Sequence, residues 1–126
     1  MILMVVMAVS KGLYNASISL DGKKNRLRVS VDAIRQLGMP SHICIRCSDS
    51  LDAIVIAACE GKYVMSFKVP ERMLRGEDCP CEITSKQFIH MLMTANQLEH
   101  EKTYRFPGEM SESGRYMRFC ISKQEV

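Results

Sequence analysis

The chain has 126 residues, 47% hydrophobic and 25% charged, with a formal net charge of +3 at pH 7. This balance is typical of an ordinary globular protein with one core, and the net charge is too small by itself to imply a polyanionic partner. A chain of this length buries enough surface to fold without disulfides or a bound metal. We therefore expect one domain over residues 1–126. Its six cysteines are not needed as disulfides or metal ligands for folding, so their presence has another explanation.

The N-terminal run, residues 1–8, is apolar throughout. It has no basic residue before it, as a secretion signal would, and it is too short to cross a bilayer as a helix. The β-branched pair Val5 and Val6 favours a buried first strand instead. We accordingly expect a cytoplasmic protein without a membrane segment, whose thiols are reduced.

Residues 14–31 have the pattern of a β-hairpin. Residues 14–20 alternate apolar and polar side chains, and Asp21-Gly22 is a tight-turn signal because both residues tolerate positive φ. Residues 26–31 alternate again, with Leu27, Val29 and Val31 on one face and Arg26, Arg28 and Ser30 on the other. The return strand is thus predicted to carry a basic outer face.

The rest of the chain alternates short helices with strands. Ser30 is a suitable cap for a two-turn helix that ends at Gly38, and the apolar stripe in residues 85–98 predicts the longest helix. A short helix is also expected at 70–75, and strands at 42–47, 53–58, 63–67, 82–83, 103–106 and 115–121. This order predicts an α+β fold of mostly antiparallel strands with two or three short helices.

An internal duplication is one interpretation of the element order. Residues 29–37 align with residues 83–91 so that the strand end, the helix cap and the apolar helix positions coincide. A strand-helix-strand-strand unit would then occur twice, in half-repeats 25–58 and 82–121. The alternative is that any capped amphipathic helix after a strand produces such a match.

Residues 25–39, Asn-Arg-Leu-Arg-Val-Ser-Val-Asp-Ala-Ile-Arg-Gln-Leu-Gly-Met, resemble the swapped-hairpin DNA-binding domains of the AbrB, SpoVT and MazE type. The resemblance extends over residues 25–58, and the matching positions are Arg26, Val29, Val31, Ile34, Arg35, Leu37, Gly38 and Met39. Asn25 and Asp32 stand where that family has glycine and proline. The resemblance implies two interleaved copies whose basic strands contact DNA phosphates. A chain with two copies would be similar to the duplicated MraZ arrangement.

The distribution of charge is compatible with the same partner without the resemblance. Residues 1–30 hold five bases and one acid, whereas the last fifty residues hold six bases and eight acids. Phosphate contact needs several long cations on one rigid face, and the candidates for double-stranded DNA are Lys23, Lys24, Arg26 and Arg28, which Arg35 could join. The plainer interpretation is a solvated hairpin, the commoner reason for basic residues at a turn.

The cysteines and histidines give no firm sign of catalysis. Cys44, Cys47, Cys79 and Cys81 form two close pairs that a structural zinc could use, but core or surface thiols are the commoner case, so we expect no metal or other cofactor. His42, His90 and His100 have no metal-binding or catalytic spacing. No nucleophile elbow, phosphate-cradling loop or paired-carboxylate motif is present, and we expect no enzyme.

Two functions remain as hypotheses. The first is a small regulatory DNA-binding protein that contacts duplex phosphates through its basic hairpin strand. The second is a protein-interaction or assembly module, for instance a homodimer, that uses a sheet edge or the Met-rich helix at 85–98 and does not bind nucleic acid.

Overall fold

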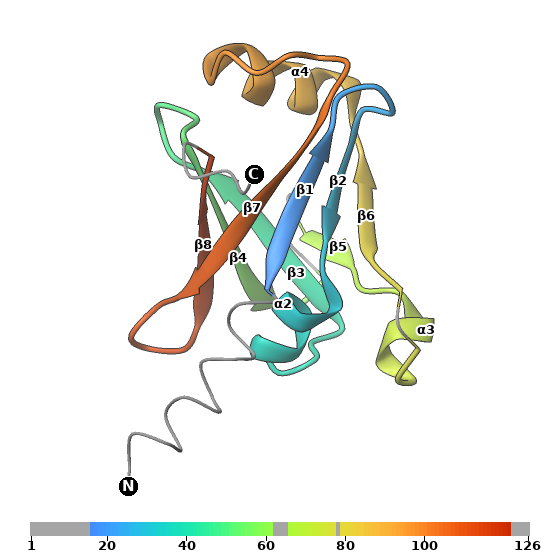
Figure 1. The fold of residues 1–126 in the computed structure, drawn as a ribbon. Helices are drawn as coiled ribbons and strands as arrows, with labels where there is room; N and C mark the ends of the chain where they lie inside the picture. Colours follow the sequence, from blue (N-terminus) through green and yellow to red (C-terminus); the bar gives the residue numbers. More distant parts are fainter. Residues whose placement is uncertain (1–15, 62–65, 78, 122–126) are drawn as a thin grey trace, which may run out of the picture.

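A computed structural model describes residues 16–61, 66–77 and 79–121 of the chain (Figure 1). Strands account for 42% of the described residues and helices for 20%, and the strands form a nearly closed eight-stranded barrel. The strands are β1 (Ser17–Asp21), β2 (Arg26–Val29), β3 (His42–Cys47), β4 (Ala53–Cys59), β5 (Ser66–Lys68), β6 (Cys81–Thr84), β7 (Thr103–Met110) and β8 (Tyr116–Cys120). The helices are α2 (Val31–Gln36), α3 (Glu71–Leu74) and α4 (Lys86–Ala95).

All the described strand pairs are antiparallel, and they follow the order β5-β3-β4-β8-β7-β1-β2-β6. In the described part of the chain, the sheet therefore has two edge strands, β5 and β6. We call the gap between them the seam of the barrel.

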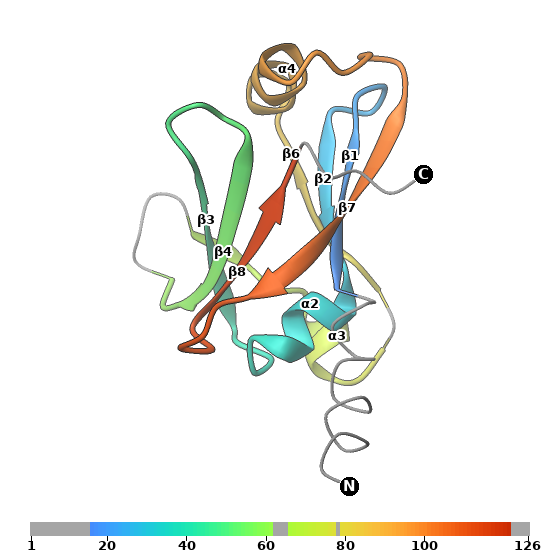
Figure 2. The ribbon, with the colours of Figure 1, turned by 60° about the vertical axis from the view of Figure 1, so that its left-hand side comes forward.

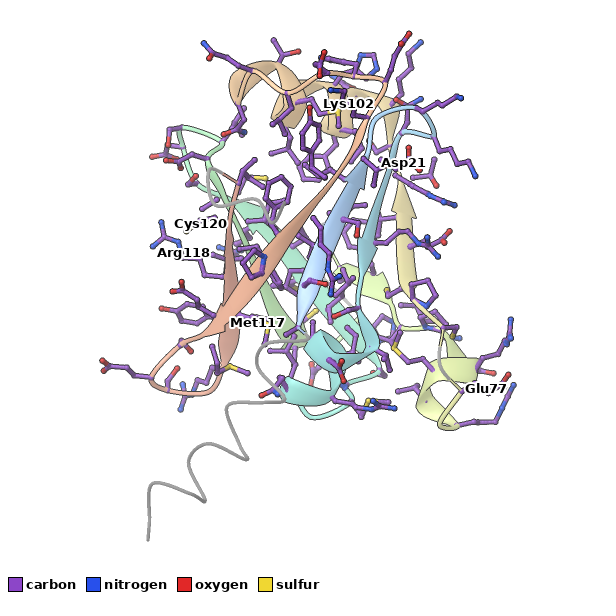
Figure 3. The ribbon with its side chains drawn as sticks, viewed as in Figure 1. Asp21, Glu77, Lys102, Met117, Arg118 and Cys120 are labelled. Carbon is purple, nitrogen blue, oxygen red and sulfur yellow. The ribbon has the colours of Figure 1, made fainter. Side chains whose placement is uncertain are left out.

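The core fills the barrel because each strand alternates between inward and outward side chains. On β1, for example, Ile18 and Leu20 are fully buried, and on β8 Met117 and Phe119 are. Figure 3 shows Arg118 and Cys120 on the outer side of the same β8 strand. The interior is thus packed with aliphatic, methionine and phenylalanine side chains.

The helices cover the two ends of the barrel. In Figures 1 and 2, α4 lies across one end, and α2 and α3 lie at the other. Ser30 and Ser85 cap α2 and α4, each accepting a hydrogen bond from the backbone N–H three residues later. The apolar face of α4 then closes its end of the barrel through Ile89, Leu92 and Met93, which are fully buried.

The expected α+β class is wrong, because the fold is dominated by its sheet. The strand-helix-strand-strand unit is also wrong as a building block. Among the described strands, β2 pairs with β1 and β6 and β6 pairs with β2 alone, so the first strand of each half-repeat does not pair with the other strands of its own half. The periodicity of the sequence identified strands correctly but carried no information on which strands would pair.

The pairings nevertheless follow a twofold pattern. The β3·β4 hairpin corresponds to β7·β8, and the β3·β5 pair corresponds to β7·β1. In the latter two pairs, Ile43 opposite Phe67 matches Phe106 opposite Ile18. This pattern exchanges β1 with β5, β2 with β6, β3 with β7 and β4 with β8. The β4·β8 and β2·β6 pairs are therefore each mapped onto themselves and lie on the twofold axis of the pattern. The counterpart of the β1·β2 hairpin would be a β5·β6 pair, and the seam lies at this position.

Two local predictions also change. The turn between β1 and β2 spans residues 22–25, and its positive φ occurs at Asn25 (54°), not at Asp21 or Gly22. The predicted turn after residue 106 begins later, because β7 continues through Pro107 and Gly108 to Met110. Pro107 lies where β7 leaves β1, and Gly108 is where it begins to pair with β8.

The predicted first strand at residues 1–8 lies outside the described residues. Among the described residues, no helix is long and apolar enough to span a membrane.

Candidate nucleic-acid interface

The candidate interface is the outer surface of β7, β1, β2 and β6, together with the adjoining helix α2. Two rows of side chains cross these four strands. One row runs Arg105, Ser19, Arg28, Glu82, and the other runs Thr103, Asp21, Arg26, Thr84. These residues alternate with fully buried Ile18, Leu20, Leu27 and Phe106, which fixes them on the outside. We call this surface, with Lys23, Lys24 and Arg35, the basic face.

The tip of the hairpin carries two exposed lysines, Lys23 and Lys24. The backbone N–H of Lys24 donates to a carboxylate oxygen of Asp21 at 3.1 Å, which fixes the turn (Figure 3 labels Asp21). Within the described part of the chain, neither ammonium group has an ion-pair partner. These two lysines are therefore available to a ligand.

The strand arginines are partly neutralised by carboxylates of neighbouring strands. Arg26 lies between Asp21, at 3.5 Å, and Glu82, at 3.6 Å, and its side chain is only 22% exposed. Arg28 Nε lies 3.0 Å from Glu82 Oε1, with the side chain 40% exposed. The geometry makes these contacts ion pairs and not hydrogen bonds, since among the described residues both Nε atoms lack a hydrogen-bond acceptor. Of these two arginines, Arg26 is consequently the less available to bind a ligand from outside.

Arg35 and Arg105 bring further positive charge to the same place. Arg35, on α2, is 54% exposed and contacts Asp32 at 3.3 Å. Arg105, on β7, donates from Nε to the Ser17 hydroxyl at 3.2 Å. A cavity of about 410 Å³ is lined by Arg28, Arg35 and Arg105 together with Ser30, Val31, Asp32, Cys79 and Pro80.

The sequence did not identify Arg105, which lies far from the hairpin along the chain. Its only usable signal was the alternation around Phe106, which places Arg105 on the outside of a strand. The pairing of β7 with β1 brings Arg105 opposite Ser19. This pairing could not be predicted from one sequence.

The structure does not bring the two cysteine pairs together into a metal site. In the part of the chain that is described, no three histidine, cysteine, aspartate or glutamate side chains are arranged to hold a metal ion. Cys44 instead lies beside Cys59 on the adjoining strand, and removal from water together with a hydrogen bond that the Cys59 thiol donates to Cys44 raises the pKa of Cys59 to about 11. Burial raises the pKa of Cys81 to about 11 as well. These two thiols are therefore protonated near neutral pH, which does not suit nucleophilic attack.

The histidines lie at separate places. The rings of His90 and His100 meet edge to face with centroids 4.6 Å apart, beside α4. His42 is on β3, where its Nδ1 lies 3.0 Å from the Ser41 hydroxyl. The carbonyl group of His100 lies beside Gly22, in the turn of the basic hairpin.

The seam offers a second, different kind of surface. A cavity of about 220 Å³ there is lined by Ile45, Phe67, Ile83, Thr84, Ser85 and Phe88. The edges of β5 and β6 beside it have no partner strand among the described residues. By contrast, the Met-rich helix uses its apolar side chains to close the barrel, and Met91 is its one large hydrophobic residue classed as exposed, at 46%, in the described part of the chain.

No protein-family model, curated protein or solved structure matches this chain.

Proposed function

We propose that this protein is a small DNA-binding regulatory protein that contacts the phosphates of duplex DNA through the basic face. One observation carries the proposal: Arg28 and Arg35, which come from different elements, line a common cavity. Lys23 and Lys24 extend the same surface at the hairpin tip. Long cations held on one rigid surface are what phosphate contact requires, because they meet the DNA backbone without reordering.

The charge on this face sets the expected strength of binding. It holds six cations and three carboxylates: Lys23, Lys24, Arg26, Arg28, Arg35 and Arg105 against Asp21, Asp32 and Glu82. Because three arginines already have acidic neighbours, we expect a modest affinity that depends on about three or four phosphate contacts. The resemblance of residues 25–58 to swapped-hairpin domains leads to the same function, and it remains a prediction. A cytoplasmic location belongs to this proposal.

The experiment is a titration of a fluorescently labelled 20-base-pair duplex with the full chain, followed by anisotropy from 25 to 200 mM salt. The proposal predicts a complex at low salt whose affinity falls steeply as salt rises, with a log–log slope of about −3. Arg28→Ala should weaken this binding, and its charge-matched control is Arg118→Ala, since Arg118 is exposed on the outer side of β8 and lies outside the basic face. A complete absence of binding at 25 mM salt would rule the proposal out.

A second candidate function is supported by the seam. Edge strands beside an apolar cavity, which β5 and β6 are within the described residues, are the features that accept an added strand from another chain. Under this alternative the protein is an assembly module, for instance a homodimer, and its association is insensitive to salt. Light scattering from 25 to 500 mM salt distinguishes the two, because a dimer through the seam keeps its doubled mass across that range.

A further inference from the structure

We propose that the basic face contains a discrete pocket for one phosphate group, built around Ser19 and completed by Arg105. This inference deepens the proposed function, since the phosphate would come from the DNA backbone, but the same chemistry would also recognise a free phosphate. The ligand class is thus a tetrahedral phosphate oxyanion.

Strand register places two arginines on either side of one serine. Ser19 is opposite Arg28 on β2 and opposite Arg105 on β7. Neighbouring strands are about 4.8 Å apart, so the two arginine backbones are separated by about 10 Å. Long guanidinium side chains can span that distance above the serine between them. This spacing allows the two arginines to hold one phosphate from opposite sides.

The Ser19 hydroxyl is the free polar group at the centre of this arrangement. It makes no side-chain hydrogen bond to any described residue, although it is partly buried. A hydroxyl can donate one hydrogen bond, and a phosphate oxygen above the sheet would accept it. Ser17 and Ser30 line the same cavity of about 240 Å³, together with Pro80 and the two arginines.

The arginines are held in position before any ligand arrives. Arg105 is anchored through Nε to the Ser17 hydroxyl, and Arg28 is held through Nε beside Glu82. The Arg28 contact uses Nε, whereas a guanidinium carries five N–H donors. Anchored guanidinium groups bind phosphate with less loss of side-chain freedom, and their paired donors match two oxygens of the oxyanion.

The charges lining the pocket favour a single phosphate group. The cavity around Ser19 adjoins the larger one, and the two share Arg28, Ser30, Pro80 and Arg105. Together they are lined by three arginines, Arg28, Arg35 and Arg105, and one acid, Asp32. Glu82 pairs with Arg28 from beside the pocket, so the three arginines face two acids, and the remaining positive charge suits one phosphate group.

The test uses inorganic phosphate as the probe and the full chain as the protein. Phosphate is titrated by NMR or calorimetry at constant ionic strength, with chloride as the balancing ion. We expect saturable binding that Arg105→Ala weakens by about tenfold or more, because charge-assisted hydrogen bonds are lost. Arg118→Ala removes the same charge from another outer strand and should leave the affinity within twofold. Ser19→Ala, which removes only the hydroxyl, should weaken binding about threefold or more.

Several outcomes would overturn the pocket. These are the absence of saturable phosphate binding, equal losses in Arg105→Ala and Arg118→Ala, or an unchanged affinity in Arg105→Ala. Circular dichroism of each variant shows that it is folded, and Arg105→Lys, which keeps the charge but not the planar fork, should lie between wild type and alanine. If Arg105→Ala unfolds the chain, Arg105→Lys and Ser19→Ala carry the test, and unchanged affinity in both refutes the pocket.

A competition experiment between inorganic phosphate and duplex DNA distinguishes the two sources of the phosphate group. If the pocket holds a DNA phosphate, saturating inorganic phosphate displaces the labelled duplex more than chloride does at equal ionic strength. If phosphate binds in the pocket but the chain binds no duplex at 25 mM salt, the pocket stands and the proposed function fails. If the duplex binds and phosphate does not, the proposed function stands and the pocket is refuted.

Discussion

Arg28 and Glu82 face each other across the β2·β6 pair, with Arg28 Nε 3.0 Å from Glu82 Oε1. The same carboxylate oxygen lies 3.6 Å from Arg26 Nη1, so one acid is shared by two arginines of the basic face. In the absence of Glu82, these arginines would present more positive charge to a ligand.

Replacement of this acid tests the electrostatic part of the proposal. We predict that Glu82→Gln strengthens duplex binding by about three- to tenfold at low salt, because one negative charge leaves the face. The effect should shrink as salt rises. The measurement is anisotropy with the labelled duplex, and Glu77→Gln, at the α3 end of the barrel (Figure 3), is the matched control. Unchanged or weaker binding by Glu82→Gln would contradict this account of the face.

The two helix caps should differ in their effect on stability. Ser30 Oγ accepts from Ala33 N–H at 3.2 Å and from Ser17 N–H at 3.0 Å, whereas Ser85 Oγ accepts only from Phe88 N–H among the described residues. Ser85→Ala should cost about 1 kcal/mol of unfolding free energy, and Ser30→Ala about 2 kcal/mol, since it leaves a second N–H without its acceptor. Urea unfolding measures both. Equal losses would show that the Ser17 contact adds no stability.

Gly22 is required for close packing and not for a positive φ. A Cβ at this position would lie 2.2 Å from the carbonyl oxygen of His100 and 2.6 Å from Met93 Sδ, and the Gly22 N–H donates to Lys102 O at 3.2 Å. Gly22→Ala should therefore destabilise the fold by about 2 kcal/mol or more, because backbone would have to move. Lys23→Ala, one residue along the same turn, is the control and should change stability by less than about 0.5 kcal/mol. A wild-type melting temperature in Gly22→Ala would refute this packing.

Because of the buried Cys81 thiol, the free energy of unfolding should decrease at alkaline pH. Its thiol is 1% exposed, and burial raises its pKa from 9.0 to about 11. Below pH 9 the thiol is protonated in both states. Between pH 9 and 11 the unfolded chain loses this proton and the folded chain keeps it, so stability decreases by about 2 kcal/mol.

The control for this pH dependence is Cys81→Ala. The variant is less stable at every pH because it leaves a small cavity, but it should lose about 2 kcal/mol less than wild type from pH 9 to 11. Urea unfolding at several pH values gives this comparison. Parallel curves for the two proteins would show that the buried thiol does not control the alkaline loss.

The sequence predicted local structure well and strand partners poorly. The strand at His42–Cys47 and the caps at Ser30 and Ser85 follow from alternation and side-chain hydrogen bonding, which are local. Pairing of β1 with β7 joins segments over eighty residues apart, and no local pattern specifies it. The barrel and Arg105 were therefore missed, and the pairing of Glu82 with two arginines was missed for the same reason.

The most direct test of the central claim compares the salt dependence of duplex binding in two multiple variants. One combines Lys23→Ala, Lys24→Ala and Arg28→Ala within the basic face, and the other combines Arg46→Ala, Arg115→Ala and Arg118→Ala outside it. We predict that the first loses about two units of the log–log slope of about −3, together with most of its affinity, while the second stays close to wild type. Equal slopes and affinities in the two variants would contradict the claim that this protein binds DNA through its basic face.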